Sequence, residues 1–405
     1  MRIFGKRHNQ RSPYLLLGVL VIGIASRINL QEPLDLHTLV LRDVDEDAFQ
    51  ISIDRMRQGW SALDPMRSFS FGFYAYGRLF WLIPGILWYV FHLIGNDAAL
   101  IFVPRLVSTL FGLMWVICVY ETLRFRLTRR QALLGAGFLL VMTGFWKNTF
   151  WFHPDHMMTA FALLAMYLFA KDASSYSRRF WWWCVAVGIA LASKLAAIIF
   201  VPVIGVYLMY GRLTKRLSFA QMVKYGVLSL GCVLVMYVLL NPYVLHPIGF
   251  NAIKTQFFID LYSNATNHGG DPTSITPLSI YTNVIQKYYV WWQVLVLLLA
   301  MWVLGTYREI RGRSKQPIII LTTFWLLLAS IYMLTAIHKE RQHYYLFPAM
   351  FLPLLFLELQ GYRERMQWVL LGLILLMQGL QQFPSLTTEF SHYLTLTQTV
   401  KYTEP

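Results

Sequence analysis

Four carboxylates lie within five residues of this sequence and could do acid–base chemistry. The stretch "RDVDEDAFQ", residues 42–50, contains Asp43, Asp45, Glu46 and Asp47. A carboxylate beside a low-dielectric surface can act as a general base towards a hydroxyl group. Several carboxylate oxygens together can also bind a divalent cation. A solvated acidic loop is the simpler interpretation, and the residues alone leave all three open.

A second cluster, "FWFHPDHMM" at residues 150–158, combines His153, Asp155 and His156. Two histidines and a carboxylate are typical zinc ligands, although three ligands from one helical turn are geometrically awkward. The same residues could position a substrate or a catalytic base. Asp155 could instead cap the start of the helix that follows.

Cations occupy three further positions at the edges of apolar segments. Lys194 interrupts "GIALASKLAAIIFVP", and Arg105 lies near the start of an apolar segment in "IFVPRLVSTLFG". Either side chain could extend to the membrane surface, but Lys194 could also bind a phosphate and Arg105 could pair with a first-loop carboxylate. The third position is "HKERQHYYLFP", which includes Arg341 and Tyr345.

The background of these polar groups is strongly apolar. Hydrophobic residues make up 57% of the 405 residues, whereas only 14% are charged. Apolar runs recur near the ~20 residues needed to cross ~30 Å of hydrocarbon, which predicts an all-α, polytopic membrane protein. The net charge of +15 arises from basic residues in short loops. It therefore indicates topology, and no nucleic-acid partner is predicted. The three cysteines fall inside apolar runs and are expected to pack in the core.

Basic residues predict how the chain crosses the membrane. Arg2, Lys6, Arg7 and Arg11 precede the first apolar segment, which places the N-terminus in the cytoplasm. We predict about eleven membrane-spanning helices in a single domain, residues 1–405, without a large soluble domain. Two long external loops, 29–99 and 241–287, are expected on the non-cytoplasmic side, where the cations of 338–345 are exceptions to the positive-inside rule. The predicted spans are residues 13–26, 100–120, 132–150, 156–170, 181–194, 196–210, 222–240, 288–306, 317–336, 344–360 and 367–383.

One apolar segment, residues 76–95, is long enough to cross the membrane but does not fit this topology. A crossing there would place "RFRLTRR", residues 124–130, outside and would invert every later basic loop. Its aromatic residues and central "IPG" break favour an external juxtamembrane helix at the interface.

The order of these motifs resembles the GT-C superfamily of membrane glycosyltransferases. The resemblance covers roughly residues 13–360 and is greatest to family 39, which contains protein O-mannosyltransferases and lipid A aminoarabinose transferases. The Asp45–Glu46 pair, "RLVSTLFG", "HPDHMM" and "GIALASKLAAI" match family motifs in order and at the expected helix boundaries. "NPYVLHP", residues 241–247, resembles the element that opens the second long loop, and "RQHYYLFPAMFLP" resembles a late family motif.

The resemblance implies transfer of a sugar from a polyprenyl-phosphate donor to a hydroxyl group of a lipid, glycan or protein acceptor. The reaction would occur with inversion on the non-cytoplasmic face. No cofactor is implied, although a divalent cation could bind the acidic first loop. Fixed cations would stabilise the phosphate that leaves. The implied site residues are Asp45 as general base with Glu46 in support, and Lys194, Arg341, Asp155, Tyr345, Arg105 and His156 on the donor and phosphate side.

Two differences from the family pattern limit which members of the family this chain can be close to. The stretch "SFGFYAYG" lacks the lysine or double proline of many members, which argues against an aminoarabinose transferase. The loop that follows Asn241 is too short for the β-domain of eukaryotic protein mannosyltransferases. The alternative function is a polytopic transporter or lipid flippase. Such proteins usually contain inverted repeats and broken helices near mid-membrane, whereas the polar residues here gather at one boundary.

Overall fold

The computed structural model describes residues 12–31, 44–64, 76–91, 97–149, 151–265, 276–312, 317–335 and 343–400. Within these ranges the regular structure is helical, and an isolated antiparallel β-bridge joins Tyr76 to Lys194. The longer helices are α1 (Ser12–Gln31), α3 (Val44–Ser61), α5 (Arg78–Val90), α6 (Asp97–Leu123), α9 (Asp155–Asp172), α10 (Arg178–Ser193), α11 (Val201–Leu213), α12 (Phe219–Leu240), α13 (Pro247–Ala265), α16 (Trp292–Gly312), α17 (Pro317–Thr335) and α19 (Glu364–Val400).

Shorter helical pieces lie at breaks between these helices. They are α7 (Arg129–Gly137), η1 (Leu139–Val141), α8 (Thr143–Thr149), η2 (Leu195–Phe200), η3 (Pro242–Leu245), α14 (Pro277–Ile280), a π-helical turn (Tyr281–Ile285), α15 (Gln286–Tyr288), α18 (His343–Ala349) and η7 (Leu352–Gly361). Each of the eleven apolar segments predicted to span the membrane contains helix in this structure.

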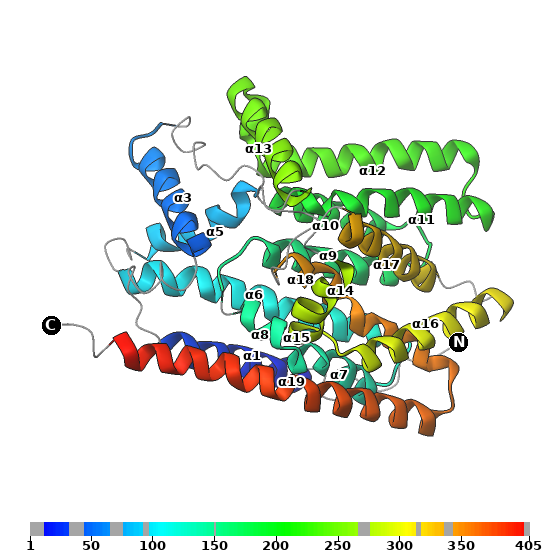
Figure 1. Cartoon of the computed structure of the whole chain (residues 1–405). Coiled ribbons are helices and arrows are strands. Elements are labelled where there is room, and N and C mark those ends of the chain that lie inside the picture. The colour runs from blue at the N-terminus through cyan, green and yellow to red at the C-terminus, as the bar shows by residue number, and fades with distance from the viewer. Residues whose placement is uncertain are drawn as a thin grey trace.

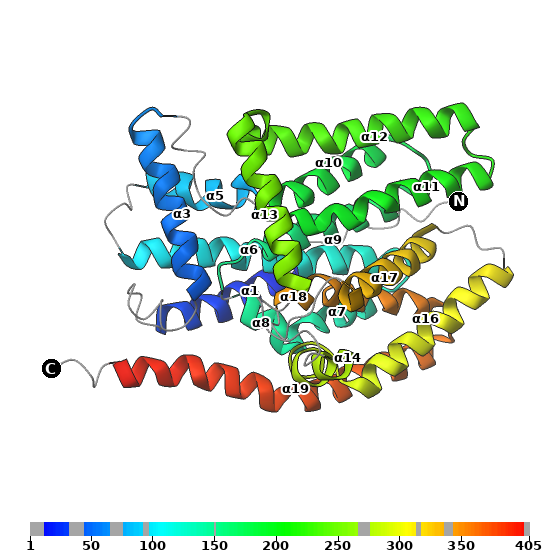
Figure 2. The same ribbon diagram turned by 45° about the horizontal axis from the view of Figure 1, so that its top comes forward.

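Most long helices run alongside one another (Figure 1). Helix α9 packs between α6 and α10, and α10 also packs against α12. Helices α3 and α13, which belong to the two predicted external loops, cross the direction of these helices at a steep angle (Figure 2). The bundle therefore contains helices of two directions, and the assignment of α3 and α13 to external loops stays a prediction.

By length and composition, four helices in the described ranges can cross a membrane: 101–123, 195–213, 219–240 and 364–388. A bent pair, 278–288 and 292–308, adds a fifth candidate with a 94° break. The number of spans stays a prediction, because several predicted spans are short or broken helices. Helix α5 has 13 residues and an expected length of about 20 Å. It is too short for ~30 Å of hydrocarbon, which favours the interfacial placement.

Helix α19 satisfies backbone groups at two of the breaks. Gln378 Nε2 donates a 2.7 Å hydrogen bond to the Tyr289 carbonyl, and Gln378 Oε1 accepts one of 3.3 Å from the Trp291 N–H. One turn further along, Gln382 Oε1 accepts a 3.2 Å bond from the Thr143 N–H. Backbone groups at membrane depth need such internal partners, so these two glutamines stabilise the broken helices.

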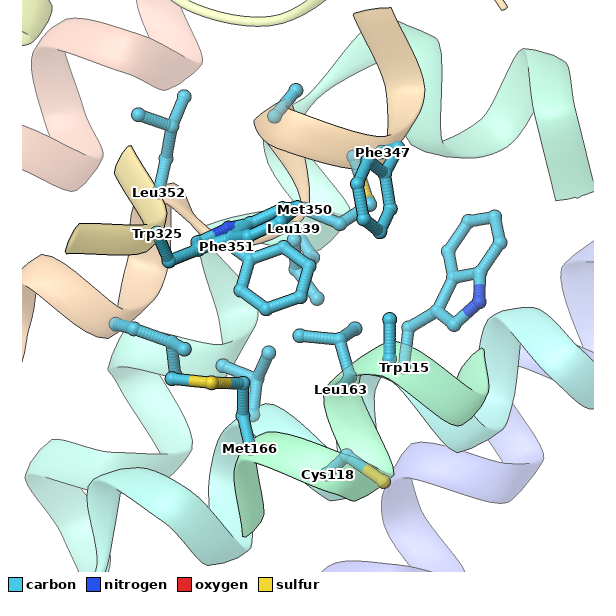
Figure 3. Packing of buried hydrophobic residues seen from close by; sticks show 14 of the residues in the cluster. Trp115, Cys118, Leu139, Leu163, Met166, Trp325, Phe347, Met350, Phe351 and Leu352 are labelled. Atoms are coloured by element: carbon cyan, nitrogen blue, oxygen red, sulfur yellow. The ribbon is translucent and has the colours of Figure 1, made fainter. Parts of the chain in front are cut away.

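Aromatic side chains fill the centre of the bundle (Figure 3). Trp325 stacks on Phe200, with ring centroids 4.1 Å apart and planes 7° apart. Phe347 and Phe351, which belong to the late motif "RQHYYLFPAMFLP", pack against the same indole. Cys118 lies within this core in Figure 3, and Cys184 is also buried. The core placement expected for these two cysteines is confirmed.

Candidate active site

A buried ion pair joins two of the predicted site residues. Lys194 Nζ lies 2.7 Å from Asp155 Oδ1 and 2.9 Å from Oδ2. The side chains are only 12% and 3% exposed. Removing two charges from water is costly unless they are paired and hydrogen-bonded, so a pair this deep is a candidate functional site.

Asp155 is the first residue of α9, but it does not cap that helix. Pro154 occupies the N-cap position, and the Asp155 N–H donates a 3.3 Å hydrogen bond to His153 Nδ1. The Asp155 carboxylate instead contacts Lys194 and His153, whose Nδ1 lies 2.6 Å from Oδ2. The capping interpretation of Asp155 is therefore wrong, because the carboxylate binds neighbouring side chains.

Lys194 owes its position to a break between α10 and η2. Its backbone is extended (φ −155°, ψ 132°) and forms the β-bridge with Tyr76, which belongs to the first predicted external loop. The Gly77 N–H donates a 2.8 Å hydrogen bond to the Ser193 carbonyl. A Cβ at Gly77 would lie 1.3 Å from the Ala192 carbonyl oxygen, so this close approach requires glycine. The Tyr76 ring lies under the lysine, with its centroid 5.2 Å from Nζ.

Asn241, at the start of the second predicted external loop, contacts the same junction. Its Oδ1 accepts a 2.8 Å hydrogen bond from the Arg78 N–H, and its Nδ2 donates a 3.1 Å bond to the Ala192 carbonyl. The Tyr243 hydroxyl donates to Oδ1 at 3.3 Å. One amide side chain therefore holds together the start of α5, the end of α10 and the end of α12.

His156 is fully buried beside this pair, and neither ring nitrogen has a hydrogen-bond partner among the described residues. Its ring lies 5.6 Å from the Trp115 ring, and Trp115 Nε1 donates to the His156 carbonyl at 3.0 Å. Buried polar atoms without partners are rare and often mark a functional position. In the described ranges no three His, Cys, Asp or Glu side chains converge as a metal site requires, so the zinc interpretation gains no support there.

Arg105 and Tyr345, the other donor-side residues in the described ranges, are also buried. Arg105 lies on α6 and is 5% exposed. Tyr345, on α18, is 1% exposed and lines an apolar cavity of about 200 Å³ together with Tyr289. Helix α18 packs against α9, the helix that begins with Asp155.

Three predicted residues are not placed in full. Arg341 lies outside the described residues. Asp45 and Glu46 lie in the first turn of α3, but their side chains are outside the described part. Helix α3 packs on α5, and the N-terminus of α5 is fixed to Lys194 through the bridge at Tyr76. The helix that bears the acidic pair is thus connected to the Lys194 junction through one intervening helix.

The sequence did not indicate Tyr76, Gly77 or Asn241 as site residues. "YGRL" stood within an apolar segment, and "NPY" was noted only as the opening of the second loop. One feature could have indicated them: Gly77 and Asn241 each lie at a helix boundary, in a chain that contains few polar residues. Their hydrogen-bonding partners, however, lie far away in sequence.

Comparison of the sequence with known protein families gives a match to a family of transferases. Residues 81–240, less than half of the chain, match the family model for dolichyl-phosphate-mannose-protein mannosyltransferase. This range contains the Arg105, "HPDHMM" and Lys194 motifs. No curated protein sequence matches the chain significantly.

Solved structures with the same fold include two kinds of transferase. The apo oligosaccharyltransferase of Archaeoglobus fulgidus has a TM-score of 0.60 and 13% identity, covering 97% of this chain and 57% of its own. The oligosaccharyltransferase AglB from Archaeoglobus fulgidus, in complex with an inhibitory peptide and a dolichol-phosphate, has a TM-score of 0.59 and 13% identity, with coverage of 95% of this chain and 56% of its own. ArnT of Cupriavidus metallidurans bound to undecaprenyl phosphate has a TM-score of 0.55, 13% identity and coverage of 89% and 62%.

The chain spans just over half the length of the archaeal enzyme. At 13% identity these similarities establish the fold. The family-model match and the helical architecture agree with them. The resemblance inferred from the order of motifs is confirmed: this chain is an integral membrane protein with the GT-C fold of membrane glycosyltransferases.

Proposed function

We propose that this protein transfers a sugar from a polyprenyl-phosphate-linked donor to a hydroxyl-bearing acceptor. The transfer takes place on the non-cytoplasmic face of the membrane and inverts the anomeric centre. The acceptor is a lipid, a glycan or a protein.

One observation carries the proposal: the buried Asp155–Lys194 pair is fixed by backbone contacts to the first external loop. A charged pair inside an apolar bundle is expensive and implies a polar ligand nearby. The same loop continues back to α3, whose first turn contains Asp45 and Glu46. Positioned acid and base groups at one membrane boundary suit the transfer of a polar sugar from a lipid carrier.

In this mechanism Asp45 removes the proton of the acceptor hydroxyl, and Glu46 supports it. The hydroxyl oxygen attacks the anomeric carbon, and the bond from that carbon to the donor phosphate breaks. The polyprenyl phosphate leaves as an anion, so donors and cations aimed at it lower the barrier. Asp155 neutralises much of the charge of Lys194, and a second cation is therefore needed; Arg341 is the residue proposed for it.

The remaining donor-side residues shape the pocket. His156 offers two buried ring nitrogens without partners, which suit hydrogen bonds to a sugar or phosphate. Tyr345 lines an apolar cavity, and Arg105 adds a cation on the neighbouring helix α6. The two solved structures that contain dolichol-phosphate or undecaprenyl phosphate support a lipid-phosphate carrier for this fold.

The experiment compares cells that contain the wild-type protein, the Asp45→Asn variant or the Asp54→Asn variant. Asp54→Asn is the control, because it removes another carboxylate from the same helix. Lipid-linked sugars and glycosylated acceptors are quantified by mass spectrometry. We expect Asp45→Asn to accumulate the donor and lose the product by more than about 100-fold, the range of general acid–base contributions. Asp54→Asn should resemble the wild type. Full product formation by Asp45→Asn would refute the assigned base.

Two further arms test the alternatives. Purified protein in vesicles that moves the lipid-linked sugar between leaflets without transfer would support the transporter hypothesis and exclude this proposal. Treatment with EDTA tests a divalent cation at the acidic loop, since unchanged transfer means that the carboxylates act without a metal.

A further inference from the structure

The loops that join α9 to α10 and α11 to α12 gather basic residues at the end of the bundle opposite Lys194. Helix α10 begins beside the first loop and ends beside Lys194, so its whole length separates the two places. The cationic surface consists of Lys171, Arg178, Arg179, Arg212, Lys215 and Arg216. All of these side chains except the half-buried Lys171 are exposed. Among the described residues none of them forms an ion pair, so no carboxylate neutralises the surface directly.

Asp172, the only acidic residue between positions 160 and 250, is buried and binds the first loop instead of the cations. Its Oδ1 accepts hydrogen bonds from the Ser177 N–H at 3.0 Å and from the Ser177 hydroxyl at 2.7 Å. Its Oδ2 accepts them from the Tyr176 N–H at 2.9 Å and from the Tyr207 hydroxyl at 2.6 Å. Three residues of the loop have a left-handed backbone, with φ between 49° and 64°: Ala173, Ser174 and Tyr176. Such a backbone is strained, so the bonds to Asp172 hold the loop in one shape.

Two arginines of the cationic surface are fixed on this loop. Arg216 Nη1 donates hydrogen bonds to the carbonyls of Ala173 at 3.0 Å and Ser174 at 3.2 Å. Arg179 Nη1 donates one to the Lys171 carbonyl at 2.9 Å. The negative end of α9 favours both contacts, but a guanidinium has five N–H groups and these bonds use only one or two of them. Both arginines are therefore held in position with donors left for a ligand.

The length of α9 puts the cationic surface at a membrane boundary. The helix has 18 residues and extends about 27 Å. This is close to the ~30 Å thickness of the hydrocarbon, so the Asp155 end and the Asp172 end lie near opposite boundaries. In the predicted topology the Asp172 end is the cytoplasmic one. The positive-inside tendency accounts for basic residues on that side, but not for a rigid loop that orients two of them.

Apolar side chains adjoin the cations in the chain. Three of them are at least half exposed: Trp182, Leu213 and Phe219. The guanidinium carbon of Arg178 lies 5.9 Å from the centroid of the Trp182 ring. Cations beside exposed apolar and aromatic side chains suit the boundary between lipid headgroups and hydrocarbon. The surface therefore offers contacts to both parts of a lipid.

We propose that the cationic surface binds the phosphate of an anionic phospholipid in the leaflet opposite Lys194. Arg179 and Arg216 donate to the phosphate oxygens, because the guanidinium fork matches phosphate geometry. The aliphatic chains lie along Leu213 and Phe219. Basic clusters at the ends of membrane helices attract anionic headgroups, whereas a soluble anion would leave these apolar side chains without a partner. The lipid is neither donor nor acceptor in the proposed transfer, so its binding can be measured independently of that function.

The test uses the full chain in neutral micelles, with lipid binding measured by native mass spectrometry. Phosphatidylglycerol offers an anionic headgroup with chains, phosphatidylcholine a zwitterionic headgroup with the same chains, and glycerol phosphate the headgroup alone. The wild type should bind phosphatidylglycerol at least about tenfold more tightly than either other probe. Arg179→Gln/Arg216→Gln should bind the two lipids about equally. If that variant does not fold, Arg212→Gln/Lys215→Gln removes two other exposed cations of the surface and should also lower the preference.

The matched control is Arg363→Gln/Arg365→Gln, which removes the same charge from exposed residues where α19 begins, at the same end of the bundle (Figure 1). This control should keep the preference for phosphatidylglycerol. Equal losses in both arginine pairs, an unchanged preference in Arg179→Gln/Arg216→Gln, or equal affinity for glycerol phosphate would overturn the proposal.

Asp172→Asn separates loop shape from net charge. The variant makes the surface more positive by one charge, so attraction by charge alone predicts tighter binding of phosphatidylglycerol. The proposal predicts weaker binding, because the loop that positions Arg216 loses its charged acceptor. If Asp172→Asn does not fold, Tyr207→Phe removes one hydrogen bond to the carboxylate and should also weaken binding. Tighter or unchanged binding in the folded variant would contradict the role given to the loop.

Discussion

The buried ion pair between Lys194 and Asp155 allows a quantitative test. Lys194→Met and Asp155→Leu each remove one charge and replace it with an apolar side chain of similar length or volume. Each single variant leaves the other charge buried without its main partner. Such losses typically cost 3–5 kcal/mol, so we expect a destabilisation of about 3 kcal/mol or more for each. Both side chains are nearly inaccessible, and solvent therefore screens the pair little.

The double variant, Lys194→Met/Asp155→Leu, should be far less destabilised than either single variant. Replacing a buried pair with packed apolar groups is often neutral, so a change within about 1 kcal/mol of the wild type is expected. The coupling energy from the double-mutant cycle should then reach several kcal/mol, above the ~0.5–3 kcal/mol typical of contacting residues. The backbone bridge between residues 76 and 194 does not depend on the lysine side chain and should persist.

The assay is unfolding of the purified protein in mixed micelles, titrated with a denaturing detergent and followed by tryptophan fluorescence. Free energies of unfolding are compared for the wild type, both single variants and the double variant. Transfer activity is measured on the same samples, and a folded but inactive double variant would separate function from stability. A Lys194→Met variant that loses less than about 1 kcal/mol, with no coupling to Asp155→Leu, would show that the pair does not stabilise the site.

Three other substitutions test the junction and the helix breaks. Gly77→Ala should destabilise the protein by about 3 kcal/mol or more, because its Cβ has no room beside α10. Gly372→Ala, which meets open space on α19, should be neutral or slightly stabilising. Asn241→Leu removes three hydrogen bonds and should cost about 2–3 kcal/mol and most of the transfer activity. Gln378→Leu should cost about 1–3 kcal/mol, since it leaves two backbone groups without partners, whereas the exposed Gln381→Leu should not.

The same unfolding titration measures the free energy of unfolding of these variants, and each prediction has a result that would contradict it. A Gly77→Ala protein of normal stability would mean that the loop does not approach α10 as closely as described. Equal stability of Asn241→Leu and wild type would mean that other contacts hold the start of α5 and the ends of α10 and α12 together. If the two glutamine variants behave alike, α19 does not stabilise the broken helices.

Much of the fold was predictable from the order of apolar segments. In hydrocarbon every backbone polar group needs an internal partner, so a run of about 20 apolar residues can form little besides a helix. Each of the eleven predicted segments accordingly contains helix among its described residues. The free-energy cost of burying a charge also explains why Lys194 and the "HPD" element could be predicted as site residues. A charged side chain within an apolar run is costly and usually has a function.

The partners of these side chains could not be predicted in the same way. Asp155 faces a lysine 39 residues later, and Asn241 bonds to backbone groups at residues 78 and 192. Such contacts depend on how helices pack and where they break, which no local pattern encodes. For the same reason the sequence left several interpretations of Asp155 open, a helix cap among them, whereas the structure pairs it with Lys194.

The sequence by itself therefore determined the helical class and the positions of the costly charges, because burial in hydrocarbon penalises each residue locally. Only the tertiary structure decided that Lys194 meets Asp155, that Gly77 touches α10, and that Arg216 contacts the loop that follows α9. Those pairings join residues far apart in the chain. They follow from the packing of side chains across helices, which is a property of the whole bundle.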